Sequence, residues 1–269
     1  MPTRRRLDVE LVRRHLARSR EHAQDLISDG VVVVDGFRAD KPSRQVDQGA
    51  SIVVAEGDRG DWVSRGAHKL LGAIDAFADR GLAVDGRVCV DAGASTGGFT
   101  QVLLSQGATW VHAIDVGYGQ LAWQLRNDER VHVMERVNIK DLQAGDLQPA
   151  PSLAVADLSF ISLRMVLPVL VTLVDSTGDV LVMVKPQFEV GRENVGAGGV
   201  VREPALRVQA LQGVADTAAA LGWPAIGVTP SVLPGPSGNV EYFLWLRHAP
   251  TESPVGLADF ERAVQEGPQ

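Results

Sequence analysis

Val88-Cys-Val-Asp-Ala-Gly-Ala-Ser-Thr-Gly-Gly98 is the stretch that decides the fold of this chain. A short apolar run ends at a carboxylate and a glycine, and two more glycines precede Phe99-Thr100. This pattern predicts a buried strand, a glycine turn and the start of a helix. In open parallel sheets, ligands bind beyond the carboxyl ends of the strands, where glycine permits close backbone approach. We therefore expect the turn to cradle a ligand, with the amides of the following helix pointing toward it.

The residues around the turn limit the chemistry of this ligand. No lysine follows the glycines, which excludes the phosphate-gripping P-loop. Trp110-Val-His-Ala-Ile-Asp115 ends the next strand with a carboxylate 22 residues after Gly93, about the spacing at which an acidic residue reaches a ribose hydroxyl. An adenosyl ligand fits this pattern. A dinucleotide also fits, although the turn is not Gly-x-Gly-x-x-Gly, and a purely structural turn is the remaining alternative.

The chain beyond residue 61 alternates apolar strands with helix-length stretches. This alternation predicts an α/β domain whose mostly parallel sheet is covered on both faces. A final pair of strands is expected to close one edge as a hairpin, and the apolar run 165–174 is expected to form a core helix. The expected strands are 88–90, 110–114, 131–134, 153–156, 180–184, 225–228 and 240–246.

A different pattern precedes this domain. Between Leu7 and Ser28, apolar residues recur at helical spacing and predict two short helices, the second capped by Ser19 and ended by Gly30. Strands are expected at 31–34 and 51–54, with a tight turn at Asp35-Gly36. We expect a small α+β domain over residues 1–60, a linker at about 56–64 and the α/β domain over residues 61–269.

Charge is distributed unevenly between these two parts. The net charge is −7, yet residues 1–24 hold seven arginines against three acidic residues. A basic arm before an acidic body suits a nucleic-acid partner, because binding depends on the local field, whereas a solvated helix face is the alternative. The single cysteine, Cys89, excludes a disulfide framework and suits a reducing cytoplasm. We find no secretory signal and no apolar run long enough to span a membrane.

Polar residues follow three of the predicted strands. Asn138 is expected either to meet an adenine edge or to serve only as a turn residue. Asp157 follows an apolar strand directly, as does Lys185, which comes after five apolar residues and before a proline. A lysine in this position indicates a site more often than a solvated surface. The glycine-bearing loop 191–200 is expected either to close over a bound ligand or to be a flexible connection.

With these residues in view, the chain resembles the TlyA family of ribosomal RNA 2′-O-methyltransferases, whose members are often labelled hemolysins. The likeness of the first domain is to an S4-type RNA-binding module and depends on Arg6-Leu-Asp, 19–24, 30–34 and Lys41-Pro42. In the second domain it depends on Ser64-Arg-Gly-Ala-His-Lys-Leu70, Asp91–Thr100, Asp157-Leu-Ser-Phe160, Lys185-Pro-Gln-Phe-Glu189 and Gly238-Asn-Val-Glu241.

The resemblance implies a Rossmann-like class I methyltransferase domain that uses S-adenosylmethionine to methylate cytidine ribose in ribosomal RNA of one or both subunits, a reaction linked to capreomycin susceptibility. It implies a catalytic group of Lys69, Asp157, Lys185 and Glu241. We expect Lys185 to act as general base, with Lys69 lowering its pKa or steadying negative charge and the two carboxylates orienting the ammonium groups.

Further residues are expected to bind cofactor or RNA. We expect a cytoplasmic, monomeric protein that needs no metal, has ribosomal RNA as its partner and makes no stable membrane association. The expected cofactor residues are Asp91, Gly93, Ser95, Thr96, Gly97, Gly98, Phe99, Asp115, Asn138 and Asp157; the expected RNA contacts are Arg6, Arg14, Arg18, Arg20, Lys41 and Arg65.

Two other functions compete with this interpretation. A membrane-lysing hemolysin needs an export route and a lipid-inserting surface, and the sequence offers neither. A methyltransferase that modifies a base or a transfer RNA commonly carries an Asn-Pro-Pro-aromatic motif or a nucleophilic cysteine. Here the corresponding strand end is Asp157-Leu-Ser-Phe160, and Cys89 precedes the turn.

Overall fold

The structure is a computed structural model that describes residues 4–17, 19–28, 30–54, 62–235 and 238–268. The chain divides into two compact units, Met1–Arg65 and Gly66–Gln269. Most of the expected linker falls in residues 55–61, outside the described residues. Each unit is therefore described by itself.

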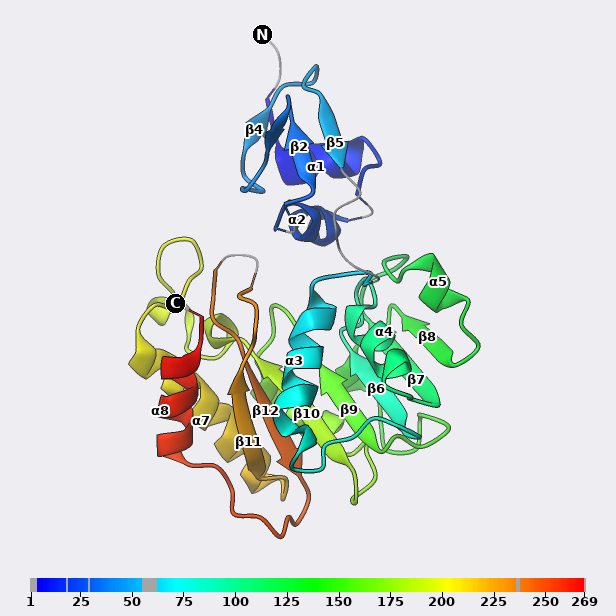
Figure 1. Ribbon diagram of the computed structural model, residues 1–269, viewed down its shortest axis with the longest axis vertical. Coiled ribbons are helices and arrows are strands. Elements are labelled where there is room, and N and C mark those ends of the chain that lie inside the picture. The colour runs from blue at the N-terminus through cyan, green and yellow to red at the C-terminus, as the bar shows by residue number, and fades with distance from the viewer. Residues whose placement is uncertain (1–3, 18, 29, 55–61, 236–237, 269) are drawn as a thin grey trace. The chain divides into compact units, whose positions relative to one another are not determined.

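The first unit is a small α+β module (Figure 1). Its two helices form where the apolar spacing predicts them, and the Ser19 hydroxyl accepts from the His22 amide at 3.1 Å, capping the second. Asp35 and Gly36 adopt φ of 53° and 83°, which forms the tight turn expected there. The two-residue strands β1, β3 and β4 were not expected, because two residues carry no periodicity. The elements are β1 (Arg5–Arg6), α1 (Leu7–Arg13), α2 (Arg20–Ser28), β2 (Val32–Val34), β3 (Phe37–Arg38), β4 (Gln45–Val46) and β5 (Ile52–Val54).

The second unit is built on a seven-stranded sheet in the order β11-β12-β10-β9-β6-β7-β8. Only β12 runs against its neighbours, which confirms the mostly parallel sheet and the closing hairpin. The strands are β6 (Val88–Ala92), β7 (Trp110–Asp115), β8 (Val131–Glu135), β9 (Leu153–Ala156), β10 (Asp179–Val184), β11 (Ala225–Pro230) and β12 (Tyr242–Arg247).

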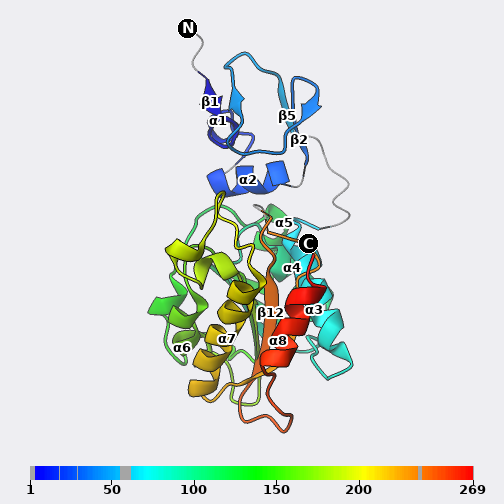
Figure 2. The ribbon, with the colours of Figure 1, turned by 90° about the vertical axis from the view of Figure 1, so that its left-hand side faces the viewer.

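Helices cover both faces of this sheet (Figures 1 and 2). Alternate strand residues face opposite sides, so Phe243 and Trp245 pack against Phe99 of α4 and Phe77 of α3. On the other face, Val182 and its equivalents in neighbouring strands pack against α6, α7 and α8. The helices are α3 (Gly66–Ala78), α4 (Gly98–Ser105), α5 (Trp123–Arg126), α6 (Leu167–Leu170), α7 (Pro204–Ala220) and α8 (Leu257–Glu266), with 3-10 turns η1 (Ile139–Asp141), η2 (Leu163–Met165), η3 (Pro186–Phe188) and η4 (Arg192–Asn194).

The run 165–174 is not the continuous core helix that its composition predicts. It holds one four-residue helix, α6, with Pro168 in its first turn, where the missing amide donor does no harm. The 3-10 turn η2 precedes it, and the Thr172 hydroxyl donates back to the Val169 carbonyl just after it ends. Most apolar residues of the run are nevertheless buried against the sheet, whereas Met165 is 56% exposed.

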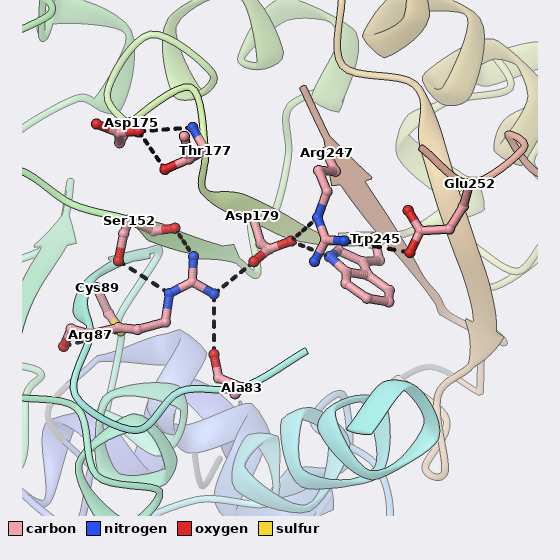
Figure 3. Close-up of polar contacts among 10 residues, drawn as sticks. All are labelled: Ala83, Arg87, Cys89, Ser152, Asp175, Thr177, Asp179, Trp245, Arg247 and Glu252. Carbon is pink, nitrogen blue, oxygen red and sulfur yellow. Dashed lines mark hydrogen bonds and ion pairs between the residues drawn. The ribbon is translucent and has the colours of Figure 1, made fainter. Parts of the chain in front are cut away.

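A polar network lies at the end of the sheet where its parallel strands begin (Figure 3). Asp179, the first residue of β10, is almost fully buried and accepts from Arg87 Nη1 at 2.7 Å, Trp245 Nε1 at 2.8 Å and Arg247 Nε at 2.9 Å. Arg87 also donates to the Ser152 hydroxyl, just before β9. One carboxylate thus joins the start of β10 to the strands on both sides of it.

Candidate active site

The order of the strands reverses between β6 and β9. From β6 the chain proceeds outward through β7 to β8, then returns to place β9 on the other side of β6. Ligands of open α/β sheets bind at the carboxyl ends of the strands next to such a reversal. Gly93 follows β6 and Asp157 follows β9, so the expected cofactor turn and the first expected catalytic residue lie at this point.

Three of the four expected catalytic residues are at the same edge of the sheet. Asp157 and Lys185 directly follow the parallel neighbours β9 and β10. Glu241 directly precedes β12, whose Tyr242 pairs with Val184 at the end of β10. The fourth, Lys69, extends from α3 to Glu241.

Lys185 is held between two oxygens of the segment that follows β9. Its Nζ is 2.6 Å from Asp157 Oδ1 and donates to Ser159 Oγ at 3.0 Å. The Lys185 and Asp157 side chains are 11% and 23% exposed, so the protein covers most but not all of this pair. Ser159 was not among the expected site residues; its position three residues after the end of β9 is the sequence feature that could have suggested it.

Lys69 and Glu241 form a second ion pair, buried more deeply than the first. Nζ and Oε2 are 2.6 Å apart, and the side chains are only 9% and 1% exposed. A Cβ on Gly235 would lie 2.5 Å from Glu241 Oε1, so this glycine leaves room for the carboxylate. Lys69 lies on a helix 172 residues away from Glu241 in sequence, so local sequence pattern could not predict that the two side chains pair.

The glycine turn owes its shape to residues in the left-handed region. Gly93 has φ of 88°, and a Cβ there would lie 2.4 Å from the Asp157 carbonyl oxygen. Gly97 has φ of 98°, and its Cβ would lie 2.3 Å from the Leu125 side chain. Both positions therefore favour glycine for conformation, and Gly93 also requires it for space, because the atom it meets belongs to the backbone. The turn after β6 consequently lies directly against the end of β9.

Asp115 connects the glycine turn to the loop after β7. Its Oδ2 accepts from the Ser95 amide at 2.8 Å, and its Oδ1 accepts from the Gly117 amide at 2.6 Å. The carboxylate thus fixes Ser95, which itself has a positive φ of 47°. Carboxylate oxygens have further lone pairs, so Asp115 retains acceptor capacity for a ribose hydroxyl.

Asp91 lies beneath the turn on the α4 face of the sheet. The residue is fully buried, and its Oδ2 accepts from the Thr100 hydroxyl at 2.7 Å, while no partner for Oδ1 is present among the described residues. Burial raises the pKa of Asp91 to about 7, and the charges of Asp157 and Asp115 act in the same direction, while the hydrogen bonds from Thr100 oppose them. An orphaned buried oxygen beside a glycine cradle fits a ligand that carries hydrogen-bond donors.

Three other expected cofactor residues have contacts within the protein. Phe99 is buried, with its ring centroid 6.1 Å from that of Phe243. Thr96 is buried too, and its carbonyl accepts from the Ala122 amide at 3.1 Å. Asn138 is exposed and caps η1 by accepting from the Lys140 amide at 3.1 Å, which is the turn role that its position also allowed. Gly98 begins α4.

A buried carboxylate, Asp8, forms ion pairs with two arginines of the first unit. Asp8 is fully buried and pairs with Arg6 at 2.9 Å and Arg20 at 3.1 Å, whose side chains remain 42% and 59% exposed. Desolvation alone would raise the pKa of Asp8, but hydrogen bonds from Arg6, Arg20 and Gln24 outweigh it and hold the pKa at about 2. The two guanidinium groups are therefore fixed side by side with free surface. Lys41 is exposed, Arg65 directly precedes α3, and Arg18 lies outside the described residues.

Arg14 differs from the other expected RNA contacts. It donates to Glu10 Oε1 at 2.8 Å, to the Ala50 carbonyl at 2.7 Å and to the Gln48 carbonyl at 2.8 Å. Its side chain is only 21% exposed. Arg14 thus bonds the end of α1 to the loop that holds Gln48 and Ala50, within the same module. Composition alone does not distinguish an arginine used in this way from one that contacts a phosphate.

An aromatic pair that the sequence-based expectations omitted flanks Lys185. Phe160 is 85% exposed at φ of 64°, and its ring centroid is 5.5 Å from that of Phe188. A bulky residue at positive φ is rare, and such backbone outliers cluster at functional sites. In the sequence, the feature that could have indicated this pair is a phenylalanine a few residues after the end of β9 and another after the end of β10.

Comparison with known proteins agrees with this geometry. Residues 62–248 match the model of the FtsJ-like methyltransferase family, and residues 5–52 match the S4 domain. A Mycobacterium tuberculosis protein named 16S/23S rRNA (cytidine-2'-O)-methyltransferase TlyA is 55% identical, and the match covers all of both chains. The chain belongs to the TlyA family.

Other members of the TlyA family carry different names. Hemolysin A of Brachyspira hyodysenteriae is 36% identical over 88% of this chain and 97% of its own. A solved structure from Streptococcus thermophilus, named as a hemolysin, is 37% identical with a TM-score of 0.75, covering 99% of this chain and 96% of that one. The resemblance and the fold expected from the sequence are both confirmed. Over the described residues, no helix is both long and apolar enough to cross a membrane.

Proposed function

We propose that this chain transfers the methyl group of S-adenosylmethionine to the 2′-hydroxyl of a cytidine in ribosomal RNA. The observation that carries this proposal is the Lys185–Asp157 ion pair, at 2.6 Å, where strand order reverses beside the glycine turn. In this proposal residues 61–269 form the catalytic domain and residues 1–60 bind RNA. We infer that the protein acts as a monomer in the cytoplasm, where ribosomal subunits are found.

The residues around the turn fit the cofactor. The turn at Gly93 to Gly98 would cradle it, Asp115 would accept from its ribose, and the orphaned Asp91 Oδ1 offers a buried acceptor. The bound cofactor supplies an electrophilic methyl group on a sulfonium. Asp157 contributes twice, because its backbone oxygen meets the turn and its side chain holds Lys185.

Lys185 is the proposed general base. In the proposed step, Lys185 first releases the proton of its ion-paired ammonium to solvent. The free amine then accepts the proton of the ribose 2′-hydroxyl as the oxygen attacks, and Asp157 stabilises the ammonium that forms again. Lys69 provides a second cation near the developing negative charge, and Glu241 fixes its position from 2.6 Å. Holding the amine and the donor at adjacent strand ends supplies orientation, which is a major source of rate in a transfer between two bound groups.

The first unit is proposed to hold the RNA by its phosphates. Arg6 and Arg20, which Asp8 aligns, are the leading contacts, with Lys41, Arg65 and Arg18 as further contacts. Arg14 contributes by closing the module. Binding through phosphates makes affinity fall with salt, so Arg6→Ala should reduce the dependence of log affinity on log salt concentration by about one counterion.

The test follows tritiated methyl transfer from S-adenosylmethionine to isolated small and large ribosomal subunits. Wild-type protein should label ribose, and mapping the label identifies the nucleotide and the subunit. Lys185→Ala should lose at least about a hundredfold in rate. Arg262→Ala, which removes an exposed cation of α8, is the matched control and should retain activity. Equal transfer by wild type and Lys185→Ala would exclude this mechanism.

A further inference from the structure

Two chain segments carry the proposed catalytic pair. The β9 segment is residues 157–163, from the end of β9 to the first residue of η2. The β10 segment is residues 185–189, around η3. Neither segment is part of the sheet. The 2.6 Å geometry of Lys185 and Asp157 therefore depends on what holds these two segments against each other.

The two segments are joined at their near ends and at their middles. At the near ends, Lys185 contacts Asp157 and Ser159. At the middles, the Phe160 and Phe188 rings meet with centroids 5.5 Å apart. Because Phe160 is mostly exposed and its backbone has an unfavourable φ, this middle contact cannot fix the β9 segment alone.

The far ends are joined by one carboxylate, Glu189. Its Oε2 accepts from the Ser162 hydroxyl at 2.6 Å, and its Oε1 accepts from the Leu163 amide at 2.7 Å. Arg164 adds an ion pair at 3.3 Å and donates to the Glu189 carbonyl at 2.8 Å. Glu189 is only 7% exposed, so these are its main surroundings.

We propose that Glu189 is a positioning residue of the methyl transfer, which holds Lys185 against Asp157 by fastening the far end of the β9 segment to the β10 segment. The inference rests on the proposed roles of Lys185 and Asp157. Glu189 itself touches neither of the reacting groups. It acts through Leu163 and Ser162, which fix where the β9 segment ends.

The electrostatics of Glu189 agree with this role. Burial raises its pKa above the ordinary value, although Ser162, Leu163 and Arg164 oppose the shift. When the partners of a buried carboxylate do not fully offset the cost of removing it from water, the carboxylate contributes little net stability compared with an apolar residue. What it provides is directional bonding to one amide and one hydroxyl.

Lysine reactivity gives a direct readout of this role. The chain has only four lysines, at positions 41, 69, 140 and 185, so an amine-acylating reagent followed by peptide mass spectrometry reports each separately. Glu189→Ala should release the β9 segment and increase the labelling rate of Lys185 by about fivefold or more, by raising the population of open states. Lys69, ion-paired to Glu241 and equally buried, should label at the wild-type rate.

Kinetics provide the second readout. Glu189→Ala should lower kcat by about tenfold to a hundredfold, the size expected for a small misplacement of a reacting group, while cofactor affinity stays within about twofold. Glu189→Gln keeps the length of the side chain and an acceptor oxygen for the Leu163 amide, so it should recover to within about threefold of wild type.

Asp179→Asn is the control for a merely structural effect. Asp179 is also a buried carboxylate bonded by arginine between strands, but it lies at the opposite edge of the sheet. At a temperature where Glu189→Ala and Asp179→Asn are both folded, only Glu189→Ala should lose kcat. Unchanged Lys185 labelling in Glu189→Ala, or a kcat loss no larger than that of Asp179→Asn, would overturn the inference.

Failure of the proposed function is a separate outcome. It would appear as no methyl transfer by wild type, or full transfer by Lys185→Ala. The labelling ratio of Lys185 to Lys69 requires no turnover, so it still decides whether Glu189 holds the Lys185–Asp157 pair.

Discussion

Replacing Asp179 by asparagine should destabilise the second unit more than any comparable change in an exposed carboxylate. Asp179 is the common acceptor for Arg87, Trp245 and Arg247, at 2.7, 2.8 and 2.9 Å (Figure 3). An asparagine can keep its oxygen toward Trp245 and Arg247, but its amide then faces the donors of Arg87. The variant thus loses one charge-assisted hydrogen bond and the negative charge between two arginines.

The size of the loss follows from the burial of the partners. A hydrogen bond to a charged group contributes about 1.5–3 kcal/mol, and removing one member of a fully buried ion pair costs about 3–5 kcal/mol. The Arg87 and Arg247 side chains are 17% and 26% exposed, so water relieves part of the cost. We expect a loss of about 2–4 kcal/mol, which lowers the midpoint of thermal unfolding by about 5–15 °C in a domain of this size.

Asp175→Asn is the matched control, four residues earlier in the loop that precedes β10. The Asp175 carboxylate accepts from the amide and hydroxyl of Thr177, at 2.8 Å each and in solvent, so its replacement should shift the midpoint much less than Asp179→Asn does. Tryptophan fluorescence mainly follows the unfolding of the second unit, which holds four of the five tryptophans, at positions 110, 123, 223 and 245. If Asp179→Asn shifts the midpoint no further than Asp175→Asn does, the Asp179 network does not hold the sheet edge as we describe.

Three further outcomes are expected. Gly93→Ala should weaken S-adenosylmethionine binding, measured by calorimetry, by at least about tenfold, because the new Cβ would lie 2.4 Å from the Asp157 carbonyl at a left-handed φ; wild-type affinity would contradict this. The folded pKa of Asp8, about 2, lies below its ordinary value of 3.8, so its contribution to the first unit is present above about pH 4 and is lost as pH falls toward 2. Amide NMR signals of residues 4–54 should show this loss, and Asp8→Asn should flatten the pH dependence. Cys89 is buried, and its pKa is raised to about 12, chiefly by burial. Iodoacetamide at pH 8 should therefore modify it only as fast as the chain opens. Equally fast alkylation of native and urea-unfolded protein would refute this.

Much of the site was predictable because its residues follow strands. Asp91, Asp115, Asp157 and Lys185 each lie in or directly after an apolar run, and the carboxyl ends of parallel strands share one edge of a sheet. Local pattern is therefore enough to gather them. Glu241 lies before an antiparallel strand, where the same rule gives no expectation.

Residues whose roles depend on contacts distant in sequence could not be assigned from pattern alone. The charge of Arg14 predicts a phosphate contact, yet its donors are satisfied by Glu10 and by carbonyls more than thirty residues away. Phe99 follows the glycine turn as a ligand contact would, yet it packs against Phe243 of β12. Side-chain identity gives the chemistry that is available, and only packing decides whether a ligand or the protein itself uses it.

The sequence by itself determined the glycine turn, the strands around it, the mostly parallel sheet and, through resemblance, the family. Each of these follows from short-range pattern, since apolar period and glycine position act on neighbouring residues. The tertiary structure alone decided that Gly93 lies against Asp157, that Lys69 pairs with Glu241, and that Glu189 fastens the loops beyond β9 and β10. These contacts join residues up to 172 positions apart, and they arise only when the sheet order brings the strand ends together.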